Sequence, residues 1–418
     1  MNTLLLALRN LNRYKTRTLV TVLAVLVSVL ISIIVDGFLR GVFNLSTYNL
    51  LAYESSEVTI YGDGYFDKRD EYPSENLIEE SEKKAIFNSL DNRGYLYAPR
   101  YKTGATLLFY NESEEIEIEL NTTILIGLDV EKDSTVYSLS KFVTDGTWLT
   151  NGKEGIVLGS KVAEKLDVKT GDTLTVELNG RDGFKEVLDQ KIVGVVNTEN
   201  PAVNSSLVFM SLDVLNDYLY LDGAISEIDV SDGSSLVAKR SFTNEINSIL
   251  PIGAKAYYYE DVNSDLMAIM TGDMGGCYFV LIFLFVIAAT GISNTMIMAL
   301  MERQKETAMM ITLGFSHKDI SFDFVLEGLL SGLIGAVIGL LIGLMILMPL
   351  SKSGIDISSL VSSDMDYGYR VPLLIRPGVY FESFIIIPLL ALFFSVLSAY
   401  LPLRHFRKKE ISTLFRGI

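Results

Sequence analysis

Cysteine, histidine and tryptophan are nearly absent from this sequence. The single cysteine, Cys277, cannot form an intrachain disulfide. Any domain of this chain that is exported from the cytoplasm must therefore be held together by its own apolar core. The two histidines, His317 and His405, stand beside basic residues and lack the neighbouring His, Cys or carboxylate pattern of a metal site. Residues 36–277 contain no histidine, which excludes a Ser/His/Asp triad there. We predict no catalytic, metal-binding or cofactor-binding residue in this chain.

A nucleotide-binding motif and a basic surface are also missing. The stretch GTWLTNGKE (146–154) has one residue too many between its glycines for a phosphate loop, and Glu154 stands where Ser or Thr would hold magnesium. We interpret it as a turn between strands. The chain carries 51 Asp and Glu against 35 Lys and Arg, which argues against a nucleic-acid partner.

Long apolar runs are what the sequence does contain. Four segments are nearly free of charge and close to or above the roughly 20 residues that a helix needs to cross about 30 Å of hydrocarbon. These predicted membrane spans are residues 19–35, 278–300, 324–350 and 383–403. The first could instead be a secretory signal, because basic residues precede it. It is longer than a signal core, however, and no small-x-small cleavage site follows, so we predict an uncleaved anchor.

The distribution of Lys and Arg predicts the orientation of these spans. Four basic residues and no acidic residue precede the first span, and five basic residues against one Glu follow the last. Basic residues near membrane ends stay in the cytoplasm, so both termini are predicted to be cytoplasmic. The predicted cytoplasmic parts are an amphipathic helix (1–18), a loop (301–323) and a basic tail (404–418); the extracytoplasmic parts are a domain (36–277) and a loop (351–382).

The predicted extracytoplasmic domain is acidic and mixes strands with helices. Residues 36–277 hold 41 Asp and Glu against 20 Lys and Arg. Alternating apolar residues predict strands within 56–62, 114–120, 173–178 and 191–196. Helical patterns follow Ser160 and Ser211, with Ser160 as a candidate cap, and Gly272, Gly275 and Gly276 should loosen the helix entering the second span. The predicted fold class is an α-helical membrane protein with four transmembrane helices and a large α+β extracytoplasmic domain inserted between helices 1 and 2.

Two carboxylates and a row of glycines stand out in or beside the spans. Glu327 and Asp36 lie near span ends, and we predict that both are hydrated at the membrane surface. Small residues recur at spacings of three and four in the third span, which predicts close helix packing, within the chain or between subunits. These glycines are Gly328, Gly332, Gly335, Gly339 and Gly343.

The stretch MERQKETAMMITLGFSHKDI (301–320) has internal structure. Glu302 to Leu313 can continue the second span as a helix, with Ala308, Met309 and Leu313 available for an apolar contact. Gly314 can end that helix, and Ser316 with Asp319 forms a candidate capping box for the next one. A solvated turn would explain the charges. A solvated turn would not explain why the stretch presents the apolar side chains of Met309, Met310 and Phe315. We therefore predict that a partner covers the stretch.

Several stretches resemble one family, the ABC-transporter permeases that include FtsX, the MacB-type permeases and the lipoprotein-releasing LolC and LolE. The resemblance covers residues 6–31, 145–178 and 192–219, the closing spans and the loop 301–320. In that loop Glu302, Arg303, Glu306 and Gly314 keep the family's frame. Thr307, Ala308 and Ile311 depart from it, where the family tends to have Ile, Gly and a basic residue.

The resemblance implies a non-catalytic subunit in a bacterial inner membrane. Such permeases work as homo- or heteromeric pairs docked on two ATP-binding subunits, which bind ATP and magnesium. Resemblance to the LolC/LolE branch implies that the permease releases lipoproteins from the surrounding membrane lipid to a periplasmic carrier. ATP hydrolysis in the partner subunit would drive this release through mechanical coupling. An FtsX-like signal relay, a MacB-like efflux permease and a membrane-tethered ectoenzyme are the alternatives. The predicted ATPase-coupling residues are Glu302, Arg303, Glu306, Met309, Met310, Leu313, Gly314 and Phe315.

Overall fold

Two units make up the chain. The computed structural model describes residues 3–110, 116–181, 183–233, 239–357, 370–371 and 374–406. The membrane unit comprises Met1–Phe43, Met270–Ser359 and Leu374–Ile418, and the sheet unit comprises Asn44–Ile269 and Leu360–Leu373. Parts of two predicted regions lie outside the described residues, namely 358–369 and 372–373 of the loop 351–382 and 407–418 of the basic tail.

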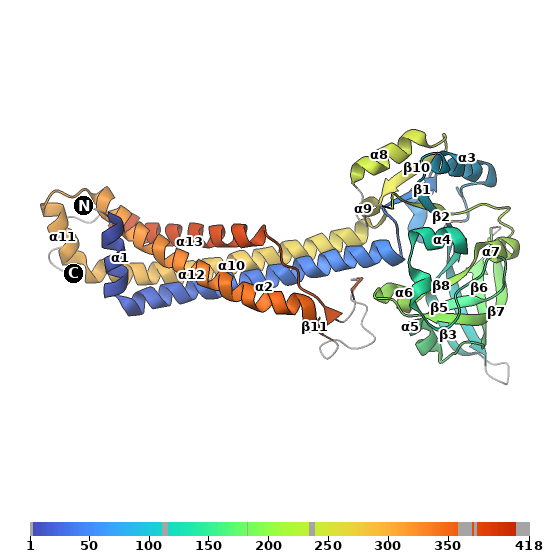
Figure 1. The fold of residues 1–418 in the computed structure, drawn as a ribbon, viewed down its shortest axis with the longest axis horizontal. Coiled ribbons are helices and arrows are strands. Elements are labelled where there is room, and N and C mark those ends of the chain that lie inside the picture. The colour runs from blue at the N-terminus through green and yellow to red at the C-terminus, as the bar shows by residue number, and fades with distance from the viewer. Residues whose placement is uncertain are drawn as a thin grey trace. The chain divides into compact units, whose positions relative to one another are not determined.

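Long helices dominate the membrane unit (Figure 1). Four are long and apolar enough to cross a membrane, and each contains one predicted span: α2 (Lys15–Tyr53), α10 (Ser264–Glu302), α12 (His317–Ser353) and α13 (Ser383–Phe406). Their buried side chains, such as Val29, Phe285, Ala336 and Ile387, form one apolar cluster. The shorter elements are α1 (Thr3–Arg13), α11 (Gln304–Thr312), β11 (Ile355–Asp356) and β12 (Leu374–Ile375).

The predicted loosening of the second span is wrong. Helix α10 runs unbroken through Gly272, Gly275 and Gly276. A glycine costs a helix only about 1 kcal/mol relative to alanine, which the hydrogen bonds and apolar environment of a 39-residue helix outweigh.

The sheet unit contains strands and short helices in alternation. Its strands are β1 (Val58–Gly62), β2 (Leu96–Tyr110), β3 (Ile116–Leu128), β4 (Val143–Gly146), β5 (Ile156–Gly159), β6 (Thr173–Asn179), β7 (Lys185–Val196), β8 (Leu207–Ser211), β9 (Glu227–Ser231) and β10 (Ala254–Tyr258). Its helices are α3 (Glu80–Asp91), α4 (Val130–Val136), α5 (Ser160–Leu166), α6 (Pro201–Ser206), α7 (Leu212–Leu219), α8 (Arg240–Ile249) and α9 (Tyr259–Val262), with 3-10 turns η1 (Phe66–Glu71) and η2 (Leu139–Phe142).

Six of these strands close into a ring. The pairings run β2–β3–β8–β5–β7–β6 and return to β2, because β6 pairs with both β2 and β7. Side chains from all six strands meet in one buried apolar cluster; examples are Leu107, Leu125, Leu158, Val176, Ile192 and Val208. Strands β9, β1 and β10 extend the sheet from β2, and β4 pairs with β7. A closed ring leaves few exposed strand edges, which stabilises a domain without disulfides.

The predicted strands of the sheet unit are confirmed, and one predicted cap is wrong. The four alternating stretches fall in β1, β3, β6 and β7, with residues 114–115 outside the described residues. The stretch 146–154 connects β4 to β5 as predicted. Ser160 is not a cap, because α5 begins at Ser160 itself, with Gly159 in the N-cap position. The Ser160 hydroxyl donates a hydrogen bond to Asn197 instead.

A buried arginine ties the ring to its extension. Arg100 of β2 is fully buried, and its Nε donates a hydrogen bond to Asp133 of α4 at 2.8 Å. Tyr137 lies under the guanidinium, 3.6 Å from its ring centroid, and donates a hydrogen bond to Asp229 of β9. Burial alone would lower the pKa of Arg100, but the facing carboxylates outweigh it and hold the pKa above its ordinary value. Arg100 therefore keeps its positive charge in the folded domain.

The carboxyl group of Glu57 should make the free energy of unfolding depend on pH. Burial raises the pKa of this carboxyl to about 7, although the backbone N–H of Asp232 donates a hydrogen bond to it. Between about pH 4.5 and 7 the unfolded chain loses this proton and the folded chain keeps it, so stability falls as the pH rises through that window. The free energy of unfolding should therefore fall less with pH in Glu57→Gln than in the parent protein, by on the order of 1–2 kcal/mol. Unfolding of the purified full-length protein at pH 5 and pH 8 measures it; parallel pH curves for the two proteins would contradict it.

Candidate functional site

The predicted coupling stretch folds as a short helix between two membrane helices. Helix α10 ends at Glu302, Arg303 interrupts it with φ −101° and ψ 16°, and α11 then covers Gln304–Thr312. The predicted continuous helix is therefore broken at Arg303. Gly314 follows with φ +94°, a conformation that favours glycine and stops α11 as predicted.

The predicted capping box at the start of α12 is confirmed. The Ser316 hydroxyl accepts a hydrogen bond from the backbone N–H of Asp319 at 3.2 Å. The Asp319 carboxylate accepts one from the backbone N–H of Ser316 at 3.1 Å. These bonds satisfy two N–H groups that a helix start leaves free, and they fix the point at which α12 begins.

One face of the stretch presents apolar side chains. Met309 is 61% exposed, Leu313 74% and Phe315 36%, and Glu302 is also exposed. Ala308, predicted to share this contact, is fully buried, so that prediction is wrong: α11 turns this side of its surface toward the unit's interior. Met310 packs partly against the apolar cluster around Ile320 and Phe324. We call Met309, Leu313 and Phe315 the apolar patch.

Glu327 lies at the centre of a buried polar cluster. Its carboxylate is fully buried and accepts hydrogen bonds from Asn10 of α1 at 2.6 Å, Arg17 of α2 at 3.0 Å and Arg303 at 2.7 Å. Asp323, one turn earlier on α12, lies 3.9 Å from Arg303. The prediction of a hydrated Glu327 is therefore wrong. Four helical segments share this carboxylate, because a charge this deep is stable only when it is paired and hydrogen-bonded.

Arg303 and Glu306, two of the predicted coupling residues, lie in and beside this polar cluster. Arg303 is 4% exposed, so it faces the unit's interior rather than the surface of the apolar patch. Glu306 lies at the surface and contacts Arg303 at 3.4 Å and Arg13 of α1 at 3.5 Å. Such an exposed pair contributes well under about 1 kcal/mol, but it places α1 beside α11.

The glycines of α12 pack against other helices of the same unit. A Cβ on Gly328 or Gly332 would lie within 2.7 Å of an α13 side chain, and one on Gly335 or Gly339 within 2.7 Å of an α2 carbonyl oxygen. Gly343 faces Ile33 of α2 at 3.2 Å. The stripe is thus occupied by contacts inside the chain, which hold α12 close to α2 and α13.

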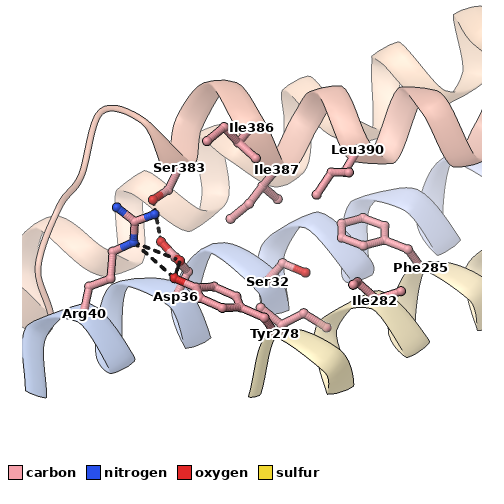
Figure 2. A pocket seen from close by; sticks show the side chains of 11 residues that line it. Ser32, Asp36, Arg40, Tyr278, Ile282, Phe285, Ser383, Ile386, Ile387 and Leu390 are labelled. Atoms are coloured by element: carbon pink, nitrogen blue, oxygen red, sulfur yellow. Dashed lines mark hydrogen bonds and ion pairs between the residues drawn. The ribbon is translucent and has the colours of Figure 1, made fainter. Parts of the chain in front are cut away.

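A second polar cluster lies far from the first along α2. Asp36 is 3% exposed and accepts hydrogen bonds from Tyr278 at 3.0 Å, Arg40 at 3.2 Å and Ser383 (Figure 2). The prediction of a hydrated Asp36 is wrong, because three helices close around its side chain. Asp36 and Arg17 are separated along α2 by about 29 Å at 1.5 Å per residue, which matches the hydrocarbon thickness of a bilayer. The two polar clusters therefore lie about one hydrocarbon thickness apart along α2.

An apolar pocket of about 280 Å³ opens beside this second cluster (Figure 2). Its walls come from α2, α10 and α13; the apolar lining is Leu281, Ile282, Phe285, Ile386, Ile387 and Leu390. Asp36, Arg40, Tyr278 and Ser383 form its polar rim. Ser32 also lines the pocket, and its buried hydroxyl has no hydrogen-bond partner among the described residues. The pocket can hold an apolar chain whose polar end meets the rim.

Two family models match separate parts of the chain. Residues 18–241 match the family model of the MacB-like periplasmic core domain, and residues 278–411 match that of the FtsX-like permease C-terminal region. The first match alone covers more than half of the chain. This protein is an ABC-transporter permease of the FtsX and MacB family.

Individual relatives of the permease are distant. The lipoprotein-releasing system transmembrane protein LolE of Haemophilus influenzae is 25% identical over 244 residues, which are 55% of this chain and 57% of LolE. An uncharacterized ABC transporter permease of Methanocaldococcus jannaschii is 22% identical over 338 residues, 77% of each chain. The periplasmic region of MacB from Actinobacillus actinomycetemcomitans superposes with a TM-score of 0.34 at 15% identity, over 50% of this chain and 92% of that one.

Membership in this family, together with four helices long and apolar enough to cross a membrane, supports a multi-pass location in the membrane. Within the described residues of the permease, no group of three His, Cys, Asp or Glu side chains could hold a metal ion. The sequence patterns did not predict Asn10, Arg17 and Asp323 at one polar cluster, nor Arg40 and Tyr278 at the other. One signal was available, since a lone Glu in an apolar run is by default a paired group and Arg17 stands at the same end of its own span.

Proposed function

We propose that this permease is the membrane subunit of an ABC machine that releases acylated lipoproteins from the membrane. ATP and magnesium bind to a separate subunit, which supplies the energy. The observation that carries the proposal is the pocket between α2, α10 and α13, whose apolar walls suit an acyl chain and whose rim suits a polar head. The distant likeness to LolE supports the same substrate class.

The proposed orientation follows from the basic residues at both ends of the chain. It places the termini and the apolar patch in the cytoplasm of a bacterial cell and the pocket at the outer face of its inner membrane. The α+β domain, inserted between the first and second spans, is then extracytoplasmic and available to a periplasmic lipoprotein carrier. An acyl chain in the outer leaflet would enter the pocket without crossing the bilayer.

The apolar patch is the proposed contact with the ATP-binding subunit. Met309, Leu313 and Phe315 expose apolar surface beside Glu302 and Glu306, and an apolar centre with a charged rim is typical of a protein interface. Gly314 fixes the turn that presents the patch. We propose that closure of the ATP-binding subunits pushes on this patch, and that the long helices pass the movement to the pocket. A second permease chain, identical or homologous, completes the pair.

Co-purification tests the partner. Extraction of the intact permease from native membranes in mild detergent should recover an ABC ATP-binding subunit in near-stoichiometric amount. Recovery of no ATPase, with the apolar patch intact, would overturn the proposal.

Filling the pocket tests the substrate. Leu390→Trp places an indole in a pocket of about 280 Å³, and we expect it to lower lipoprotein release into solution at least tenfold while the ATP-binding subunit still co-purifies. The measurement is release of palmitate-labelled lipoprotein from vesicles, and Met345→Trp, at a position 78% exposed on α12, is the matched control. Unchanged release in Leu390→Trp would contradict the pocket's role. A permease that binds the ATPase but never contacts lipoprotein would favour the signal-relay alternative.

A further inference from the structure

The wall of the apolar pocket contains a hydroxyl group without a partner among the described residues. Ser32 of α2 is fully buried, and its Oγ makes no hydrogen bond there. Figure 2 places its side chain between the polar rim around Asp36 and the apolar lining around Phe285. Ser32 precedes Asp36 by four residues of the same helix, so it lies about 6 Å from the rim along the helix axis, on the side of the apolar lining.

Other serines of the membrane helices satisfy their hydroxyl groups locally. Four of them donate to the backbone carbonyl four residues earlier in the same helix, namely Ser28, Ser331, Ser395 and Ser398. Ser32 makes no bond of this kind. A hydroxyl that has left water without gaining a new partner raises the free energy of the folded state. A ligand that brings a hydrogen-bond acceptor to Ser32 would recover this cost.

The hydroxyl groups of the rim, by contrast, already have an acceptor. Tyr278 and Ser383 both donate to the Asp36 carboxylate, and Arg40 donates to the same group. Of the polar side chains that line the pocket, Ser32 alone is left without a partner in the described part of the chain. A ligand in the pocket would therefore meet one uncommitted donor, one helical turn away from the rim.

We propose that Ser32 donates a hydrogen bond to the carbonyl oxygen of an ester- or amide-linked acyl chain, so that the pocket selects acyl chains over ether-linked chains. The assignment rests on the proposed function and names the group by which the pocket recognises its substrate. The polar head meets the rim, the carbonyl lies at Ser32, and the hydrocarbon chain continues along Leu281, Phe285 and Leu390. An ether-linked chain carries a CH2 group in place of the carbonyl and would leave the hydroxyl unsatisfied.

A carbonyl suits this position better than a water molecule does. A buried water needs two to four polar partners, and the lining on this side of the pocket consists of apolar side chains such as Leu281, Phe285 and Ile387. A carbonyl oxygen attached to a hydrocarbon chain needs only one donor, and the chain itself fills the apolar part of the pocket. The single hydroxyl in an apolar wall thus matches the single polar group near the head of an acyl chain.

Two synthetic lipopeptides test the assignment on the purified full-length permease in mild detergent. Both are the same short peptide with an N-acetylated, lipidated cysteine; one carries two palmitoyl ester chains on its glyceryl group, and the other carries two hexadecyl ether chains. Separate titrations followed by native mass spectrometry give the Kd of each. The parent protein should bind the diester about fivefold more tightly than the diether, the effect of one net hydrogen bond.

Ser32→Ala should reduce this preference to less than about twofold. Ser28→Ala is the matched control, because it removes a hydroxyl one turn away on α2 that donates to a backbone carbonyl and lies outside the pocket lining. It should keep the preference of the parent protein. Equal thermal unfolding of the variants shows that both fold.

The outcomes separate the role of Ser32 from the role of the pocket. Equal affinity of the parent protein for the two lipopeptides, or a preference that survives Ser32→Ala, would overturn the assignment of Ser32 and leave the acyl-chain pocket standing. Equal loss of affinity for both lipopeptides in Ser32→Ala would show a packing role and overturn it as well. Binding of neither lipopeptide, or binding that Leu390→Trp leaves unchanged, would overturn the proposed function of the pocket and the assignment with it.

Discussion

Glu327→Ala should lower the free energy of unfolding of the permease by roughly 3–5 kcal/mol, enough to abolish its recovery as a folded protein. The substitution removes the carboxylate that accepts from Asn10, Arg17 and Arg303, all of which are buried or nearly so. Two guanidinium groups would then be left with Asp323 and the half-exposed Glu306 as the nearby carboxylates. The cost is the desolvation of a charge that has lost its partner, which exceeds the value of the ion pair itself.

Thermal unfolding and folded yield in a fixed detergent measure this loss. Glu327→Gln is the matched comparison, because the amide oxygen can still accept one of the three hydrogen bonds, and it should lose less stability than Glu327→Ala. Glu382→Ala is the surface control: Glu382 pairs with Arg40 at 3.1 Å, but its side chain is 73% exposed, so removal should cost under about 1 kcal/mol. Equal melting of Glu327→Ala and Glu382→Ala would show that the buried cluster does not hold the helices together.

Glu327 also shows where prediction from sequence stops. Hydropathy predicts the four membrane helices because the bilayer demands a local property, about 20 successive apolar residues. The capping box was predictable for the same reason, since Ser316 and Asp319 are three residues apart. The partners of Glu327 on α1 and α2 are 317 and 310 positions away in the chain, and no local pattern pairs them.

Pairing over long distances limits the prediction of the sheet as well. Alternation predicted several strands correctly, but it carries no information about which strands are neighbours. The contact of β6 with both β2 and β7, which closes the ring, depends on register across separate parts of the chain. Likewise the glycine spacing predicted a close approach to α12, and only the structure shows that α2 and α13 make it. Local chemistry was predictable here, and the choice of partner was not.

The second large effect concerns the apolar patch. Met309→Asp combined with Leu313→Asp should weaken association of the ATP-binding subunit by at least 30-fold, corresponding to about 2 kcal/mol for loss of apolar contacts at the centre of an interface. Both side chains are more than half exposed, so the permease itself should fold and insert normally. Pull-down of the ATP-binding subunit by the immobilised permease, with unfolding of the free permease in parallel, measures the two quantities separately.

The matched control keeps the patch apolar. Met309→Leu combined with Leu313→Met preserves side-chain volume and hydrophobicity, so association should change by less than about threefold. Full association of the Asp double variant would show that another surface binds the ATPase. Loss of association in the conservative variant as well would show that shape rather than apolar area decides the contact. Weak association of the Asp variant alone would place the energetic centre of the interface at the C-terminal end of α11, the helix that begins directly after Arg303. A push on α11 would then reach α12 and α2 directly through the Glu327 carboxylate.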